Sequence, residues 1–416
     1  MSPRRFAPVA VALLLALAGC GAGPTGTTPT ETPDQHASPT PTPTSTNDTG
    51  GPGGAARYRV TVENGSLPFN ATRTYARVQS LLGTDVAPRP VVVRNLSEWR
   101  GSLRGVAASP LNRALGFENV TPNWSSPSGV TVRTGRVYLH PGRASAGAVE
   151  RTLAHEFAHA IQERTGMLPW ERRLSRGGRM TVDQRKTRGA LIEGGAVYVA
   201  DAYADRYLDV RNNTALVERL YRNGSATYRS AFAQYRYGAR YVRRRIDSPR
   251  NLSAVYRHPP RTTEQLMHGL TRAEEPPANL SVTRAGAGDQ WRYVGDNTLG
   301  ELTLLSTLDV ALNRSRSAAA AAGWGTDELL VYARDPGSGP YGWTWVLRDD
   351  DPAEAAELES ALREFADARA NASTQAFRVT SVDDRTVALT FGDPAFVANA
   401  TATATDDGGV RVAVGG

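Results

Sequence analysis

The spacing of apolar residues predicts helices through the middle of the chain. From Leu153 to Ile161 they recur every three or four positions, without Pro or Gly before Gly166. This is the period of one face of an α-helix. A second surface with the same period runs from Leu191 to Ala200. Between Phe232 and Ile246 the same spacing is interleaved with arginines, which predicts an amphipathic helix with a solvated basic face.

Alternating apolar and polar residues predict short strands before and after these helices. Residues 57–63 and 90–94 have this pattern, and residues 129–132 and 135–140 predict a hairpin or sheet edge ahead of the first helix. Later in the chain we expect helices at 302–322 and 352–370 and strands at 343–347, 377–382 and 386–391. The predicted fold class is α+β, with a mainly helical core and a small edge sheet over 56–301 and a C-terminal α+β region at 302–416.

The first 55 residues predict a signal peptide and a stalk. Arg4 and Arg5 precede an apolar run from Phe6 to Leu17, which is short for a membrane span. The run ends in Leu-Ala-Gly-Cys20, which resembles the lipobox of prokaryotic lipoproteins. We therefore assign residues 1–19 to a lipoprotein signal peptide and residues 20–55 to the lipidated Cys20 and a disordered Thr- and Pro-rich stalk. The expected location is extracytoplasmic, at the cell surface, with the lipid anchored in the membrane.

Composition and charge narrow the choice of partners. The net charge is +7, and Lys186 is the one lysine among 48 basic residues. Acids are interspersed with the arginines and no nucleic-acid motif occurs, so we expect no nucleic-acid partner. A less favoured alternative for residues 236–250 is binding of an anionic wall polymer or lipid head groups. Thirteen Asn-x-Ser/Thr sequons agree with an exposed glycoprotein, although sequons also arise by chance in such a composition.

The strongest chemical signal is a His-Glu-x-x-His motif on the first predicted helix. His155 and His159 stand at i and i+4, which places them about 5–6 Å apart on one helix face, where both can hold one metal ion. Glu156 is placed to touch the bound water of that metal, as in zinc peptidases. The alternative is a buried helix with two hydrogen-bonded histidines and an ordinary glutamate. Only six histidines occur in the chain, which favours the metal site.

Glu193 is the candidate for the third zinc ligand. It lies within the apolar surface of the second predicted helix, where a carboxylate costs several kcal/mol unless it is paired or bound to a metal. Gly194 and Gly195 would weaken that helix by about 1 kcal/mol each. They are explained if the helix packs closely against the helix that carries His155. The alternative is a helix with an internally paired glutamate.

These residues resemble a known group of enzymes. His-Glu-x-x-His followed by a helical Glu-Gly-x-Ala is similar to the gluzincin, or thermolysin-like, zinc metallopeptidases. His-Ala-x-Gln after the motif and the segment from Tyr256 to His268 resemble uncharacterised haloarchaeal and other prokaryotic surface lipoproteins. The resemblance covers about residues 131–301 and implies a zincin-like metallopeptidase domain over 56–301. It implies Zn²⁺ as cofactor, His155, His159 and Glu193 as its ligands and Glu156 as the base.

The sequence departs from the thermolysin-like pattern at one supporting position. Four residues after Glu193, where those enzymes have an Asp that orients a histidine, this chain has Val197. We expect Asp201 or a backbone carbonyl to take that role. For the second catalytic residue we assign His268 as the oxyanion donor, with His258 and Tyr198 as other candidates. The alternative for the segment before His268 is a plain helix start capped by Thr262.

These features predict a lipid-anchored, extracytoplasmic zinc metallopeptidase that hydrolyses peptide bonds through a zinc-bound water activated by Glu156. Its partners would be a peptide or protein substrate and, through the lipid, the membrane. We expect a monomer. The alternative is a catalytically weak or inactive surface protein on a zincin scaffold, with a binding or structural role.

Overall fold

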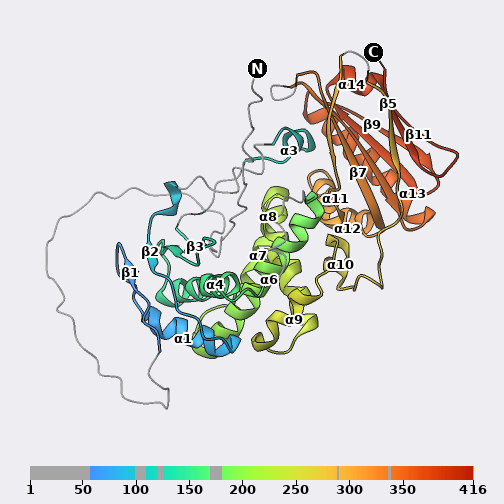
Figure 1. The fold of residues 1–416 in the computed structure, drawn as a ribbon. Coiled ribbons are helices and arrows are strands. Elements are labelled where there is room, and N and C mark those ends of the chain that lie inside the picture. The colour runs from blue at the N-terminus through green and yellow to red at the C-terminus, as the bar shows by residue number, and fades with distance from the viewer. Residues whose placement is uncertain are drawn as a thin grey trace, which may run out of the picture.

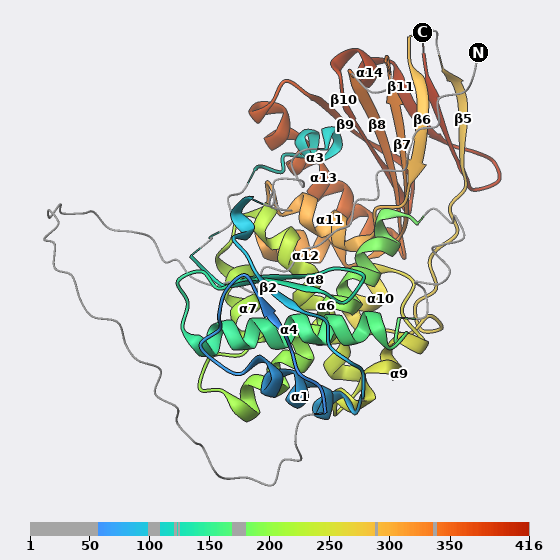
Figure 2. The same ribbon diagram turned by 60° about the vertical axis from the view of Figure 1, so that its left-hand side comes forward.

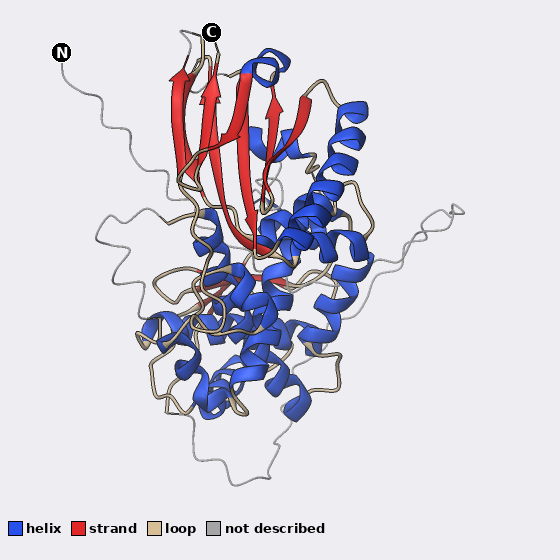
Figure 3. Ribbon diagram, turned by 90° about the vertical axis from the view of Figure 1, so that its right-hand side faces the viewer, coloured by secondary structure: helices blue, strands red, loops and turns tan. Residues whose placement is uncertain are grey.

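The structure is a computed structural model. It describes residues 57–98, 109–119, 123, 125–168, 180–287, 290–335 and 339–415. The predicted signal peptide, Cys20 and the stalk lie outside these residues. Helices gather at one end of the molecule and the large sheet at the other (Figure 3). The described residues form twelve α-helices and three sheets, which confirms the α+β fold class.

A small mixed sheet lies beside the first helices. Its strand order is β1-β2-β4-β3, and β3 pairs with β4 in the antiparallel direction at one edge. This confirms the predicted hairpin. The predicted strand at 57–63 is largely wrong, because the Val60 amide donates to the Thr72 hydroxyl instead of to another strand. The bounds are Val62–Glu63 (β1), Val91–Val93 (β2), Ser128–Thr131 (β3) and Val137–His140 (β4).

Helices form the body on one side of this sheet (Figure 1). α6 contacts both α4 and α8, and one apolar core joins these helices to α1 and the small sheet. Within the described residues, none of the helices has the length and apolar composition needed to cross a bilayer. The bounds are Ala71–Leu82 (α1), Pro110–Leu115 (α3), Ala146–Arg164 (α4), Val182–Tyr207 (α6), Asn213–Asn223 (α7), Ala226–Arg245 (α8), Leu252–Arg257 (α9) and Thr263–His268 (α10), with 3₁₀ turns at Leu96–Glu98 and Pro249–Asn251.

The predicted basic amphipathic helix is α8, and its arginines serve contacts within the chain. Arg236 and Arg240 pair with Glu218 of α7. Arg243 pairs with Asp201 of α6, and Arg244 donates to the carbonyl of His268. α8 therefore connects three neighbouring helices through its basic side.

Two glycines allow α6 to approach its neighbours closely. A Cβ on Gly194 would lie 2.1 Å from the backbone carbon of Gly238 on α8, so the two helices meet at these glycines. A Cβ on Gly195 would lie 2.0 Å from the Tyr256 hydroxyl and 2.9 Å from Nε2 of Gln162 on α4. The expected close approach to α4 is thus made by Gly195, whereas Gly194 serves the contact with α8.

The C-terminal part is a sheet covered on both faces. The five-stranded antiparallel sheet has the order β6-β7-β8-β10-β9, and successive residues of its central strands enter two different cores. One core contains α11, α12 and α13, and the other contains the three-stranded sheet β11-β12-β5. The predicted helix at 302–322 is two helices, because Asn313 caps a new start. Figure 2 shows α13 along the sheet.

The elements of this part extend from Val282 to Val414. β5 and β6 precede residue 301 and pair with strands that follow it; the division of the chain at residue 301 stays a prediction. The bounds are Val282–Ala287 (β5), Arg292–Asn297 (β6), Glu301–Leu308 (α11), Arg314–Ala321 (α12), Trp324–Ala333 (β7), Tyr341–Asp349 (β8), Pro352–Ala372 (α13), Ala376–Asp383 (β9), Thr386–Gly392 (β10), Pro394–Asn399 (α14), Ala400–Ala404 (β11) and Val410–Val414 (β12).

Candidate metal centre

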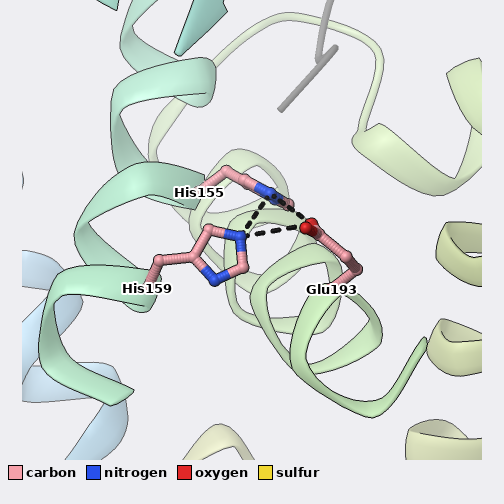
Figure 4. Close-up of side chains that lie close together, drawn as sticks. All are labelled: His155, His159 and Glu193. Carbon is pink, nitrogen blue, oxygen red and sulfur yellow. Dashed lines mark hydrogen bonds and ion pairs between the residues drawn. The ribbon is translucent and has the colours of Figure 1, made fainter. Parts of the chain in front are cut away.

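Two adjacent helices bring the two histidines and the glutamate together. His155 and His159 project from one face of α4, and their Nε2 atoms lie 3.1 Å apart. Glu193 reaches them from α6 (Figure 4), with its Oε2 atom 3.3 Å from Nε2 of His155 and 3.2 Å from Nε2 of His159. All three side chains are largely buried. The group is one that could hold a metal ion.

The spacing of these atoms fits a tetrahedral metal. In a tetrahedron with metal–ligand bonds of about 2.0–2.1 Å, as Zn²⁺ makes with histidine nitrogen and carboxylate oxygen, two ligand atoms lie about 3.3–3.4 Å apart. The three separations here are 3.1, 3.2 and 3.3 Å. The donor set of two imidazoles and one carboxylate is also one that catalytic zinc sites use. The residues present therefore fit the ion that the sequence predicts.

Charge attraction dominates the electrostatics of the group. Burial alone would lower the pKa of the His159 imidazole, but the Glu193 carboxylate outweighs burial and raises that pKa to about 9. Burial would likewise raise the pKa of Glu193, but the two histidines lower it to about 2. The carboxylate is therefore ionised across the physiological range, as a metal ligand must be.

Glu156 is buried beside the edge strand β3. Its Oε2 atom accepts a hydrogen bond of 2.7 Å from the Thr131 hydroxyl, whereas its Oε1 atom has no hydrogen-bond partner in the described part of the chain. Burial raises its pKa, and the nearby imidazoles of His159 and His155 oppose this rise. A Cβ on Gly129 would lie 2.4 Å from Cγ of Glu156, so only glycine allows β3 to come this close. One carboxylate oxygen is therefore fixed by Thr131, and the other is buried without a hydrogen-bond partner among the described residues.

Gln162 orients His159, a role that the sequence analysis did not assign. Its Oε1 atom lies 2.8 Å from Nδ1 of His159, and its Nε2 atom donates to the carbonyl of Ile192 and to the Tyr256 hydroxyl. Ile192 precedes Glu193, so this one amide connects the two helices that carry the ligands. The position of Gln162 three residues after His159 was the available signal, because i and i+3 share a helix face.

Asp201 does not take the orienting role expected of it. It accepts hydrogen bonds from the backbone and hydroxyl of Thr214 and pairs with Arg243. Nδ1 of His155 has no hydrogen-bond partner among the described residues. The ring of His155 is instead held by packing, with the Tyr235 ring at a centroid distance of 6.3 Å.

The candidates for the oxyanion donor lie outside the group of three. Nε2 of His268 lies 2.9 Å from Oε1 of Glu301, and Tyr198 donates to the carbonyl of Ile246. His258 lines a separate cavity of about 400 Å³ whose lining contains none of the three candidate ligands. Thr262 caps α10, as the alternative for that segment proposed. The catalytic role of His268 stays a prediction, and its ring nitrogen is already engaged.

In the comparison with known proteins, one part of the chain matches a family model. Residues 290–408 match a family described as a domain of unknown function (DUF8575). The match includes the five-stranded sheet and excludes His155, His159 and Glu193. No curated protein and no solved structure matches the chain. The case for the metal centre therefore depends on its geometry.

Proposed function

We propose that this protein is a zinc-dependent metallopeptidase whose ion is held by His155, His159 and Glu193. The observation that carries the proposal is the three ligand-atom separations of 3.1 to 3.3 Å, which match the edges of a tetrahedral zinc site. The position of a buried acid, Glu156, between the two histidines on α4 supports hydrolysis rather than storage of the metal. We also propose that the helical part of the chain has a zincin-like fold.

A zinc ion in this centre would act as a Lewis acid and lower the pKa of a bound water to about 7. Glu156 would accept a proton from the attacking water through Oε1 and deliver it to the amine nitrogen as the peptide C–N bond breaks. Thr131 would hold the other oxygen of Glu156 throughout. Proton transfer by such a positioned group contributes typically about 10²–10⁴-fold to the rate.

We extend the proposal to the place where the enzyme acts. The Leu-Ala-Gly-Cys20 sequence supports lipidation of Cys20, and lipidation would hold the protein at the outer surface of the cell membrane. Its substrate would be an extracytoplasmic peptide or protein, and the enzyme would act as a monomer. Replacing Cys20 with Ser should move the protein from the membrane fraction to the soluble fraction. Retention of this variant in membranes would contradict lipid anchoring.

The function is tested by zinc content and turnover in the full-length protein. Elemental analysis should find about one zinc per chain in the wild type and in Glu156→Gln. Glu156→Gln should lose at least about 10²-fold in peptide hydrolysis, since only the proton transfer is removed. Glu163→Gln is the matched control, because Glu163 is on the same helix and partly exposed.

Two results would contradict the proposal. Absence of zinc after incubation with the metal would mean that the three side chains do not bind it together. Full turnover by Glu156→Gln would remove the base assignment. Zinc binding without hydrolysis by the wild type would favour the alternative of an inactive zincin scaffold with a binding role.

A further inference from the structure

A second group of acids lies where the helical part meets the large sheet. Carboxylate oxygens of Glu264, Glu275 and Asp350 all lie within 4.8 Å of one another. Glu264 comes from α10, Glu275 from the loop after it, and Asp350 from the corner between β8 and α13. α10 lies between the helices and the sheet in Figure 2. We call these three residues the carboxylate cluster.

The buried member of the cluster lacks any neutralising contact. The side chain of Glu264 is 2 % exposed, and its Oε2 atom has no hydrogen-bond partner among the described residues. Two neighbouring buried acids also have carboxylate oxygens without a hydrogen-bond partner among the described residues. Asp349 is 1 % exposed with both carboxylate oxygens unpartnered, and Glu301 is 1 % exposed with Oε2 unpartnered. Buried carboxylates of this kind cost several kcal/mol unless a cation or a proton compensates them.

The cations near the cluster are few. His268 pairs with Oε1 of Glu301, and Arg385 donates to the backbone carbonyl of Asp350. Asp351 is used as the N-cap of α13, where it accepts hydrogen bonds from two backbone amides. No described arginine forms an ion pair with Glu264, Glu275 or Asp350 within 4.0 Å. The charge of Arg385 opposes the rise in the pKa of Asp350, and that of His268 opposes the rise in the pKa of Glu275, whereas the acids around Glu264 raise its pKa. The buried carboxylate of Glu264 is therefore left for another group to balance.

We propose that Glu264, Glu275 and Asp350 bind a divalent cation, with calcium preferred. All the donors are carboxylate oxygens, which suit hard cations and do not favour zinc over calcium. Calcium binds six to eight oxygens at about 2.3–2.6 Å in flexible geometry, whereas magnesium demands a near-ideal octahedron and usually keeps several waters. The carboxylate oxygens lie within 4.8 Å of one another, so one ion could contact all three, with neighbouring acids and water completing its shell.

The pKa values of the buried acids are raised, as expected for carboxylates that need either a proton or a cation. Burial, followed by the charges of Glu301 and Asp350, raises the pKa of Glu264 to about 10. Burial and the charges of Glu354 and Asp350 raise the pKa of Asp349 to about 8. These acids gain stability either by keeping protons or by binding a cation. The two explanations give opposite results in the experiment below.

Cation binding at the cluster would fasten the metal centre to the sheet. Asp183, near the start of α6, accepts hydrogen bonds of 2.8 and 2.6 Å from the backbone and hydroxyl of Thr263 on α10. α6 also carries Glu193. A calcium ion joining α10 and its loop to Asp350 would therefore fix the base of α6 against the C-terminal sheet.

The test uses full-length protein stripped of metal with a chelator and then reloaded with zinc. Calorimetric titration with calcium should find about one site per chain, and calcium at about 100 times its dissociation constant should raise Tm by about 3–4 °C. Asp350→Asn and Glu275→Gln should each weaken calcium binding at least about 10-fold. Both residues are only partly buried, so these variants should fold. Glu274→Gln, one residue away and exposed, is the matched control and should bind as the wild type does.

Failure of this proposal is separable from failure of the zinc site. Glu193→Gln should lose zinc and keep calcium binding, because Glu193 is not part of the cluster. A wild type that gives neither heat nor a Tm change up to about 10 mM calcium, above the range of weak extracellular sites, would overturn the proposal and leave protonation as the explanation. Unchanged calcium affinity in Asp350→Asn would overturn it as well.

Discussion

The molecule solves the problem of buried carboxylates in two different ways. At the metal centre, Glu193 lies beside two imidazoles, and the pKa of Glu193 falls to about 2. In the carboxylate cluster, Glu264 is surrounded by other acids, and its pKa rises to about 10. The same side chain is thus held ionised in one place and needs either a proton or a cation in the other. Mixed nitrogen and oxygen donors favour zinc, whereas oxygen alone favours calcium.

Removing the carboxylate of Glu193 from the metal centre should cause the largest loss of zinc affinity. Glu193→Ala leaves two imidazoles without the carboxylate between them, so zinc affinity should fall more than about 100-fold, exceeding the usual effect of losing a supporting hydrogen bond. A competition assay with a chromogenic chelator measures the change. Glu218→Ala, which removes an acid paired with surface arginines, should leave zinc affinity unchanged. Equal affinity in both variants would mean that Glu193 is only a charge partner of the histidines.

The next largest effect should come from the group that orients a ligand. Gln162→Leu removes the acceptor for Nδ1 of His159 and the donor to the carbonyl of Ile192. Loss of such supporting contacts typically lowers metal affinity about 10–100-fold. The same competition assay should show this loss, while calcium binding at the cluster stays as in the wild type. A loss of calcium affinity of similar size would indicate general unfolding instead.

The two sites also differ in how far the sequence could predict them. His155 and His159 are neighbours because a helix places i and i+4 on one face, and Glu193 was conspicuous as an acid in an apolar surface. The cluster had no such signal. Residues 264, 275 and 350 meet only because α10 packs near the corner between β8 and α13, and Asp349 to Asp351 have the composition of an ordinary solvated turn.

The secondary-structure elements also differ in how far the sequence could predict them. α13 was predicted at 352–370, within two residues of its observed ends. For α4 the apolar period from Leu153 to Ile161 predicted the helix but not its start, which is Ala146. β5 was not predicted, because its sequence Val-Thr-Arg-Ala-Gly-Ala has little apolar alternation. It pairs with β12, more than 120 residues later in the chain. Such a pairing depends on the finished sheet and not on local preference.

Glu156 is intermediate between the two kinds of carboxylate, because a neutral hydroxyl holds one of its oxygens. Thr131→Val keeps the shape and removes that hydrogen bond. We expect kcat to fall about 10-fold with zinc content unchanged, since a hydrogen bond to a charged group is worth about 1.5–3 kcal/mol and part of it is regained by relaxation. Thr131→Ser retains a hydroxyl and should retain most of the activity. Equal kcat in the Val and Ser variants would show that the hydroxyl does not position Glu156.

The smallest predicted effect is a change in stability whose sign depends on calcium, and it distinguishes cation binding from protonation at Glu264. Glu264→Gln preserves volume and removes one charge from the cluster. In chelator, the variant should be more stable than the wild type by roughly 1 kcal/mol, because an uncompensated buried acid is neutralised. That difference corresponds to a Tm increase of about 1 °C. In saturating calcium the order should reverse, because the wild type gains binding energy that the variant lacks. A variant that is more stable than the wild type under both conditions would mean that Glu264 holds a proton and binds no cation. The carboxylate cluster would then be neutralised by protons, without calcium.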